Sequence, residues 1–595
     1  MNPAKTLLLT LLTLAPTLHA QTSPDTIYFH GNILTGSHLR ADDASSTPAR
    51  VTALAIAGGK ILATGTDNDL LKLKSNKTKL IDLQNAFVMP GFNDAHTHLY
   101  SAGFQKKLSV DLDGTRSLSD MQHRIAAYAT RTKSVTWIQG AGWDHTLWPT
   151  KTLPTRTDID TVTGNHPALF TRTDGHILVA NSAALAAAHI TATTPDPPGG
   201  KIDRDLSGNP NGIIREDPAM RLLYARIPPP TLEDRSLALT AAIQDALAHG
   251  VTSVQDYSPA YENFLILESL EKEGHLPLRI SEWQDFNLPL AVLEERRARH
   301  AADDPLLHFG LLKGFMDGSL GSRTAALQQP YFDDPGNSGL PRYEQSTLDN
   351  LATERAAAGF QLGFHAIGDR ANSIALNAFS AAEQVAAPPP AHGDPDATIV
   401  TTTSPTFTPT SLRLRIEHAQ VVLPQDFDRF AQLGIVASMQ PSHLLTDMNW
   451  AAARLGPERT KYAYAWRSFL DHGVTLAFGT DYPVEPINPF RGLYSAITRQ
   501  NEAGTKTFEP QEKITLSEAI YAYTQASAFA EFREDTKGRL EPGFLADFII
   551  LDRDITKATP RQLLATRVLR TIVRGAVVYS APAPAAPKSS SKALR

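Results

Sequence analysis

Residues 88–98 have the sequence VMPGFNDAHTH, in which two histidines, His96 and His98, follow an apolar segment. Residues two apart on a strand point to the same face, so these two imidazoles can bind one ion together. Three more potential metal ligands stand at or near the ends of other apolar segments. They are His365 in FQLGFHAIGD, His418 in LRLRIEHAQ and Asp481 in TLAFGTDYP. Because barrel enzymes carry their chemistry at the carboxyl ends of their strands, the pattern predicts a metal hydrolase site at the mouth of a TIM barrel.

Eight apolar, β-rich segments are candidates for the strands of this barrel. They are residues 86–92, 251–256, 278–284, 309–316, 360–365, 412–418, 434–440 and 474–480. Helix-like stretches that end in glycine separate most of them, such as RSLALTAAIQDALAHG and LDNLATERAAAG. This alternation predicts an α/β fold of the (β/α)8 class. A doubly wound sheet would alternate in the same way, but no glycine-rich phosphate loop follows the first strand.

The two ends of the chain are predicted to form one small β-sandwich. Short strand-like segments with glycine turns occur in residues 21–85 and again in 538–580, and neither set could bury its apolar face alone. The barrel would then comprise residues 86–103 and 236–537. The segment 104–235 is too long for a simple connection, so we expect an inserted subdomain over the active site.

The N-terminus has the layout of a secretory signal peptide at residues 1–20. Lys5 precedes the apolar stretch TLLLTLLTLAPTL, and the small residue Ala20 ends it. Cleavage there predicts a mature chain that begins at Gln21 and is periplasmic or secreted. The stretch is too short to span a bilayer comfortably, and no other segment approaches that length, so no stable membrane anchor is expected.

The composition limits the chemistry and the partners. The chain has no cysteine, which excludes thiolate ligands and cysteine nucleophiles. Its formal net charge of -6 offers no basic field for nucleic acid, so we expect a small-molecule substrate. Assembly as a homodimer stays open. The Pro- and Thr-rich segment 385–411 and the tail 581–595 have the composition of disordered segments and are not expected to carry chemistry.

Eight motifs extend this pattern over nearly the whole chain. They are PGFNDAHTHL, GAGWDHTLWP, TRTDGHILVANSAAL, DPPGGKIDRDLSGNPNGIIRE, KGFMDGSLGSRTAAL, HAIGDRAN, RIEHAQ and GTDYPVEPINPF. Taken together, they resemble the amidohydrolase superfamily, and specifically amidohydrolase family 3, which includes enzymes similar to N-substituted formamide deformylase. The motifs are highly specific for the family and much less so for the substrate.

The resemblance implies one or two divalent metal ions, with zinc as the expected metal. The implied ligands are His96, His98, Lys313, His365, His418 and Asp481. The first two with Asp481 would hold the more buried ion, and His365 with His418 the second. Lys313 matches a lysine that is carboxylated in many relatives and bridges the two ions. Independently, an amine reacts with carbon dioxide only when unprotonated, and burial beside cations lowers a lysine pKa. The alternative is an ordinary cation paired with Asp317.

The predicted chemistry follows from what such metals do. Zinc lowers the pKa of bound water toward about 7 and polarises a carbonyl. Asp481 would orient the nucleophile, accept its proton and deliver it to the leaving nitrogen. The sequence therefore predicts a secreted metal-dependent amidohydrolase that hydrolyses a carbon–nitrogen bond of an amide, formamide or cyclic amide. A deaminase or a dipeptidase stays open on the same ligand set, as does a catalytically silent periplasmic binding protein.

Candidates for substrate binding come from the insert and from the barrel. His176 and Asp174, near Asn181, form a polar loop, and periodicity does not decide whether His176 faces substrate or serves the structure. Trp143 could line the pocket with Trp148, although buried tryptophans more often serve packing.

Two more candidates follow barrel strands. Arg323, in GSLGSRTAA, could bind a substrate carboxylate or cap a loop. His443, in MQPSH after the seventh strand, could support the site or stabilise an oxyanion.

Overall fold

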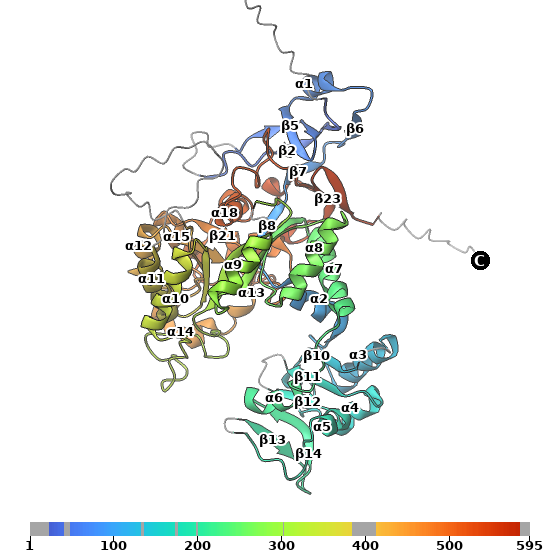
Figure 1. The fold of residues 1–595 in the computed structure, drawn as a ribbon, viewed down its shortest axis with the longest axis vertical. Coiled ribbons are helices and arrows are strands. Elements are labelled where there is room, and N and C mark those ends of the chain that lie inside the picture. The colour runs from blue at the N-terminus through green and yellow to red at the C-terminus, as the bar shows by residue number, and fades with distance from the viewer. Residues whose placement is uncertain are drawn as a thin grey trace, which may run out of the picture.

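The computed structural model describes most of the chain, namely residues 23–40, 48–132, 136–172, 177–197, 200–300, 303–383 and 412–582. The predicted signal peptide, the segment 385–411 and residues 583–595 of the predicted tail lie outside these ranges. Figure 1 shows an elongated molecule with small sheets at one pole, a helix-covered sheet in the middle and a separate sheet at the other pole.

Eight parallel strands form the central sheet. In order they are β8 (Phe92–Thr97), β15 (Val251–Asp256), β16 (Arg279–Asp285), β17 (Leu307–Phe315), β18 (Leu362–Ala366), β19 (Arg415–His418), β20 (Val436–Met439) and β21 (Leu476–Phe478). Each strand pairs in parallel with the next. A parallel bridge between Thr97 and Tyr482 joins the first strand to the segment that follows the last. The sheet is therefore a nearly closed barrel, which confirms the predicted (β/α)8 class.

Helices cover the outside of the barrel and its ends. They are α2 (Leu99–Leu108), α7 (Leu232–Ala248), α8 (Tyr261–Lys272), α9 (Leu290–Arg299), α10 (Gln345–Ala357), α11 (Asp369–Glu383), α12 (Asp426–Gln432), α13 (His443–Asp447), α14 (Ala451–Thr460), α15 (Trp466–Asp471), α16 (Pro489–Thr498), α17 (Leu516–Ala522) and α18 (Gln525–Ala530). The longest, α7, begins at a capping box of Thr231 with Asp234 and is followed by Gly250 in a left-handed conformation. Gly103 lets α2 approach α7, because a Cβ there would lie 1.7 Å from the carbonyl oxygen of Ala238.

The predicted first barrel strand, 86–92, is wrong. Its apolar part forms β7 (Phe87–Pro90), which pairs with β2 (Asn32–Leu34) and β22 (Phe548–Leu551) in another sheet. The barrel strand is the following β8, whose sequence FNDAHT is buried at all six positions. Polar side chains fill this strand because it lines the functional site, so apolar content pointed to the wrong segment. The predicted boundary of the sandwich at residue 85 accordingly moves to Pro90.

Strands from both chain ends make two further sheets. One has the order β5 (Lys60–Gly65), β4 (Ala53–Ala57), β1 (Thr26–Phe29) and β6 (Lys79–Asp82); the other has the order β24 (Ala576–Ser580), β23 (Val568–Val573), β22, β7, β2 and β3 (Arg50–Val51). The short helices α1 (Asp67–Leu70) and α19 (Pro560–Leu564) accompany them. Tyr28 and Leu54 from the N-terminal part share one apolar core with Phe548 and Ile572 from the C-terminal part.

The segment between α2 and α7 forms a mixed sheet of its own. Its order is β13 (Lys201–Arg204), β14 (Pro210–Arg215), β12 (Ile177–Ala180), β11 (Ala168–Arg172), β10 (Ile138–Trp143) and β9 (Val110–Asp111). Helices α3 (Leu118–Arg131), α4 (Arg156–Thr163), α5 (Ser182–Ala187) and α6 (Asp217–Tyr224) pack against it. Among the described residues, no helix is long and apolar enough to cross a membrane.

Candidate metal centre

The candidate ligands gather at the carboxyl ends of the barrel strands. His96 lies near the end of β8 and His98 just beyond it, while Asp481 follows β21. Asp94 joins these two strands, because its carboxylate accepts hydrogen bonds from the backbone N–H and the hydroxyl of Thr480 at 2.9 and 2.6 Å. The backbone N–H of Asp481 then donates to the carbonyl of His96 at 2.8 Å. These bonds bring residues nearly four hundred positions apart in sequence into one cluster.

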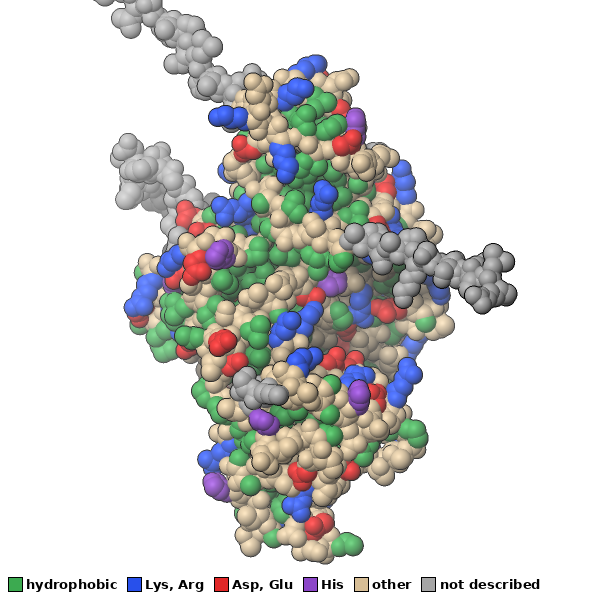
Figure 2. Space-filling view, turned by 90° about the vertical axis from the view of Figure 1, so that its right-hand side faces the viewer, with side chains coloured by type: hydrophobic (Ala, Val, Ile, Leu, Met, Phe, Trp, Pro, Cys, Tyr) green, Lys and Arg blue, Asp and Glu red, His purple; other side chains and the backbone are tan. Residues whose placement is uncertain are grey.

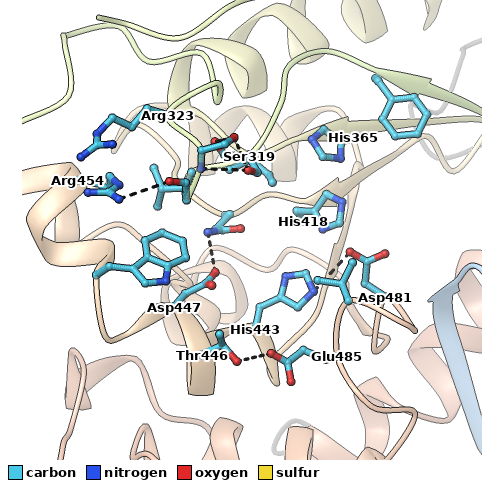
Figure 3. Close-up of a pocket in the computed structure, with 18 of the residues that line it drawn as sticks. Ser319, Arg323, His365, His418, His443, Thr446, Asp447, Arg454, Asp481 and Glu485 are labelled. Atoms are coloured by element: carbon cyan, nitrogen blue, oxygen red, sulfur yellow. Dashed lines mark hydrogen bonds and ion pairs between the residues drawn. The ribbon is translucent and has the colours of Figure 1, made fainter. Parts of the chain in front are cut away.

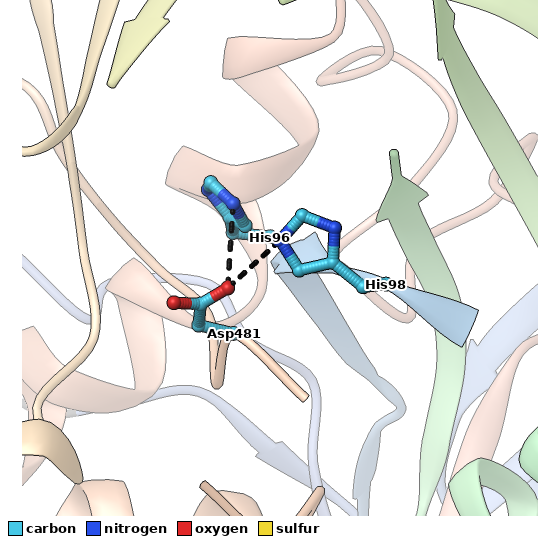
Figure 4. Close-up of side chains that lie close together, drawn as sticks. All are labelled: His96, His98 and Asp481. Atoms are coloured by element: carbon cyan, nitrogen blue, oxygen red, sulfur yellow. Dashed lines mark ion pairs between the residues drawn. The ribbon is translucent and has the colours of Figure 1, made fainter. Parts of the chain in front are cut away.

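His96, His98 and Asp481 converge on one point (Figure 4). Nε2 of His98 lies 3.0 Å from Oδ1 of Asp481, and Nε2 of His96 lies 3.5 Å from the same oxygen. Oδ1 is buried and accepts no hydrogen bond from the part of the chain that the structure describes. Two imidazoles and one carboxylate within 4.8 Å of one another match the nitrogen and oxygen ligands of a zinc site.

Other groups fix the orientation of these two rings. Nδ1 of His96 lies 2.7 Å from Oε2 of Glu417, and Nδ1 of His98 lies 2.9 Å from the carbonyl oxygen of Tyr257. Both acceptors require N–H at Nδ1, which leaves the Nε2 lone pairs directed at the cluster. Glu417 is in turn paired with Arg415, whose Nε lies 2.6 Å from Oε1, and all three side chains are fully buried.

A second group shares Asp481. It consists of His418, His443 and Asp481, and Nε2 of His443 lies 3.5 Å from Oδ2 of Asp481. Nδ1 of His418 lies 2.7 Å from Oε1 of Gln440. His365 stands beside His418, with ring centroids 4.5 Å apart, but its Nε2 faces the carbonyl oxygen of Gly318 at 3.0 Å. In this conformation the group thus contains His443, which sequence reasoning had not assigned as a ligand, and His365 lies outside it.

Lys313 of β17 reaches the same cluster. Its Nζ lies 2.9 Å from Nε2 of His96, and its side chain is fully buried. The alternative of an ion pair with Asp317 is wrong. The carboxylate of Asp317 instead accepts the backbone N–H groups of three residues in neighbouring loops. The charges that act on Lys313 are those of Glu417, Asp481 and Arg415.

Burial sets the protonation states of these groups. Burial and the nearby charge of Lys313 lower the pKa of His96 to about 3, and burial with the neighbouring His365 lowers the pKa of His418 well below its usual value. Burial lowers the pKa of Lys313 to about 8. For Asp481, burial works toward a higher pKa, but the histidines around it outweigh that effect and hold the pKa well below its usual value. For His98, burial works toward a lower pKa, but the hydrogen bond and the charge of Asp481 outweigh it and raise the pKa above its usual value. Neutral imidazoles and an ionised carboxylate are the forms that bind metal, so His96, His418 and Asp481 are in forms that fit a divalent ion.

Backbone strain also marks this cluster. His418 and Asp481 have φ angles of 74° and 59°, in the left-handed region that non-glycine residues rarely adopt. Such conformations cost about 1–3 kcal/mol and persist where the surrounding structure requires them, often at functional sites.

The cluster forms the floor of a cavity of about 790 Å³ (Figure 3). His365, His418 and Asp481 lie at one end of the view, and Arg323 and Arg454 lie at the other. Apolar side chains and several hydroxyl and carboxylate groups also line the cavity, including Phe315, Leu320, Ile367, Thr446, Asp447, Trp450 and Glu485. The space accommodates a small organic molecule that reaches the cluster with one end.

The profile of the amidohydrolase family matches residues 79–579 of this sequence. The chain belongs to the amidohydrolase family. This confirms the resemblance inferred from the motifs, including its assignment to the family-3 branch.

Individual relatives agree with this assignment over nearly their full length. The chain is 32% identical to the putative amidohydrolase YtcJ of Bacillus subtilis, covering 89% of this chain and 96% of that protein. It is 28% identical to the N-substituted formamide deformylase of Arthrobacter pascens, covering 92% and 98%. An uncharacterized metal-dependent hydrolase of Pyrococcus horikoshii has a similar structure, with a TM-score of 0.72, 28% identity and coverage of 90% and 99%. The chain is therefore a metal-dependent hydrolase acting on carbon–nitrogen bonds, as the sequence predicted.

Only some of the predicted substrate-binding residues of this amidohydrolase line the cavity. Arg323 and His443 line the cavity. The interpretation of Trp143 as a pocket wall is wrong. Its side chain is fully buried in the insert's own core beside Trp148, and its Nε1 donates to the carbonyl of Phe170 at 2.9 Å. Packing, which the sequence analysis gave as the more frequent role of buried tryptophans, is the role that the insert's own core gives to Trp143.

The other candidates in the insert are Asn181, His176 and Asp174. Asn181 is buried and caps helix α5. His176 and Asp174 lie outside the described residues. No residue of the insert within the described ranges lines the cavity.

Sequence reasoning missed three residues that bear on the site. Glu417 and Arg415 stand two apart in RIEH, and the period of a strand could have placed them on one face. Arg454 at the start of α14 carried no such signal, because its cavity contact depends on a loop more than a hundred residues away.

Proposed function

We propose that this amidohydrolase hydrolyses an amide, formamide or cyclic amide bond, other than a peptide bond, in a small molecule. The observation that carries the proposal is the convergence of His96, His98 and Asp481, of which His98 and Asp481 line a cavity of about 790 Å³. The name of the Arthrobacter relative favours formamides within this range of substrates. We expect one or two divalent ions, with zinc as the metal, because nitrogen ligands predominate in the cluster.

The residues of this chain divide the work of hydrolysis. A divalent ion, when bound, supplies an activated water and polarises the carbonyl group. Oδ1 of Asp481 faces the two histidines of β8, and Oδ2 faces His443. One carboxylate oxygen can therefore serve as a ligand while the other takes a proton from the nucleophile and passes it to the leaving nitrogen. His443 Nε2, which is buried and makes no hydrogen bond within the described ranges, is positioned to stabilise negative charge on the carbonyl oxygen.

We propose that Lys313 carries a carboxylate on Nζ in the metal-loaded enzyme. Its Nζ lies between aromatic rings and 2.9 Å from His96 Nε2, where a protonated amine would compete with a metal ion for the same lone pair. An added carboxylate would remove that competition and supply oxygen ligands.

We also propose export to the periplasm or the medium after cleavage at Ala20, based on the layout of residues 1–20. The partner would be a small molecule and not a nucleic acid. Figure 2 supports this view, because Lys and Arg are interspersed with Asp and Glu over the face shown. Intact-mass measurement of protein from a periplasmic fraction should give a chain that begins at Gln21, and a full-length chain in the cytosol would refute export.

Metal analysis combined with a substrate screen tests the proposed activity. The purified protein should contain zinc or another divalent ion and should release amine from at least one compound in a panel of N-formyl amines, N-acyl amines and cyclic amides. Chelation should abolish turnover, and added metal should restore it. A metal-loaded protein that cleaves none of these compounds but deaminates a heterocycle would refute the proposal.

A further inference from the structure

The cavity has a cationic end that the proposed chemistry does not use. Arg323, in the loop after β17, and Arg454, on α14, both line it, and Figure 3 shows them at the end away from Asp481. The hydrolytic groups stand at the other end, so neither arginine is needed for the reaction itself. The two guanidinium groups therefore lie at the end of the cavity where the part of a substrate remote from the hydrolytic groups would bind.

These two arginines share a single carboxylate. The carboxylate of Asp333 accepts hydrogen bonds from Nε and Nη2 of Arg323, at 3.2 and 3.0 Å. It also forms an ion pair with Nη1 of Arg454. Asp333 itself is not part of the cavity lining. The next acidic residue, Asp334, accepts a hydrogen bond from Asn337 and forms no ion pair with either arginine among the described residues. The charge of Asp334 also acts on Arg323, but the two guanidinium groups line the cavity and neither Asp333 nor Asp334 does.

The guanidinium groups also retain unused donors. Nε of Arg454 is buried and has no hydrogen-bond partner among the described residues, where its Nη2 makes only a 3.5 Å contact with the carbonyl of Gly321. Nη1 of Arg323 makes no hydrogen bond to any residue in the described ranges. A buried donor without a partner is costly, so such a group in a folded protein suggests a missing partner.

The backbone of Arg323 is held in an unfavourable conformation. Its φ of 58° lies in the left-handed region, in a loop where Gly321 packs against the ring of Trp450. The ring of Trp450 is also the surface over which the Arg454 guanidinium lies, at 5.9 Å. Strain at a cavity-lining residue is typical of positions that serve a ligand.

We propose that Arg323 and Arg454 form a subsite for a carboxylate, or a similar anionic group, at the end of the substrate remote from the scissile bond. This inference rests on the proposed function and narrows its substrate class to acylated or formylated amines that carry an acid. A carboxylate suits the planar donor groups of arginine better than a neutral substituent does. The competing feature is Asp447 on another wall, which bonds to the hydroxyl of Tyr464 and would favour a cationic substituent instead.

Matched substrates test the subsite directly. The probes are N-formyl hexylamine, N-formyl aminohexanoate and mono-N-formyl diaminohexane, together with shorter N-formyl amino acids down to N-formyl glycine. Wild-type kcat/KM should be highest for one of the carboxylates. Arg454→Met should lower that value by about tenfold to a hundredfold, the range for a hydrogen bond to a charged group, and should change the neutral probe by less than about threefold. Asp333→Asn should instead raise kcat/KM for the carboxylate probe, because it removes the anion that pairs with both guanidinium groups.

Arg459→Met is the matched control. Arg459 also lies on α14, but it donates to the backbone carbonyls of Gln329 and Pro330 and does not line the cavity. The Arg459→Met variant should rank the three six-carbon probes by kcat/KM in the same order as the wild-type enzyme. Equal kcat/KM for the carboxylate and neutral probes would overturn the subsite, and a preference for the ammonium probe would assign recognition to Asp447.

A binding measurement separates this inference from the proposed function. Calorimetry with hexanoate and hexylamine on the metal-loaded protein requires no turnover. Hexanoate binding that weakens in Arg454→Met supports the subsite, even if every formamide probe proves inert and the proposed activity fails. Hexanoate binding that Arg454→Met does not change would mean that the carboxylate binds only the metal ion, and this would overturn the subsite.

Discussion

Replacement of Glu417 by Gln tests whether the ring orientation of His96 controls metal binding. Glu417 accepts a hydrogen bond from Nδ1 of His96 at Oε2 and another from Nε of Arg415 at Oε1. The side chain is buried, which holds both contacts in place. Burial alone would raise its pKa, but the charge of Arg415 and the bond from His96 lower the pKa to about 2. Gln keeps the shape of the side chain, removes the charge and replaces one acceptor by a donor.

Two effects of this substitution can be estimated. Loss of a carboxylate that orients a metal-bound histidine typically costs about tenfold to a hundredfold in metal affinity, or about 1.4–2.8 kcal/mol. The other effect concerns Arg415, whose remaining partners, Gln255, the carbonyl of Ala95 and Ser438, are all neutral. A buried cation without its anion costs about 3–5 kcal/mol of folding free energy. We therefore expect both weaker metal binding and a lower unfolding midpoint.

Glu531→Gln separates the two effects. Glu531 is buried and pairs with Lys537 at 2.5 Å, and it accepts from Asn93 at 2.6 Å, without touching a candidate ligand. Competition with a chelator of known affinity measures metal binding, and chemical denaturation of the metal-free proteins measures stability. Both variants should be destabilised, but only Glu417→Gln should lose metal affinity. Unchanged metal affinity in a folded Glu417→Gln protein would refute the role of the Glu417–His96 contact. An equal loss of metal affinity in both variants would mean that general destabilisation causes the loss.

Three other predictions concern the site and the insert. The double substitution of His96 and His98 by Ala should remove the metal and the activity while circular dichroism still reports a folded barrel; full metal content would refute these ligands. Asp481→Asn should lower turnover by about a hundredfold or more and reduce metal content less, because the amide oxygen can still bind the ion; near-normal turnover in the loaded variant would place the base elsewhere. Trp143→Phe should lower the stability of the insert by about 1–3 kcal/mol, through loss of the bond to Phe170, with little change in kcat; a large drop in kcat at unchanged stability would contradict its structural role.

The sequence by itself predicted the barrel, which the structure confirms, and the first candidate metal group, whose three residues lie together in the structure. The spacing of His96 and His98 is a local property of one strand, and the position of Asp481 after an apolar run predicted a strand end. Both signals depend on a few neighbouring residues, so they need no knowledge of long-range contacts. Motifs spread along the chain then indicated the family without a structure.

Only the tertiary structure decided how the remaining residues are used. The apolar run at 86–92 was compatible with the barrel sheet and with the sheet of the chain ends. The pairing of β7 with the distant β22 places it in the sheet of the chain ends. His443 lies with His418 and Asp481 in one group that could hold an ion, while His365 lies beside that group. Arg454 and Arg323 meet at one carboxylate, through contacts between residues far apart in the chain. Composition and periodicity describe which face of an element is apolar, but they do not say which distant element covers it. That information exists only once the chain has closed into a barrel.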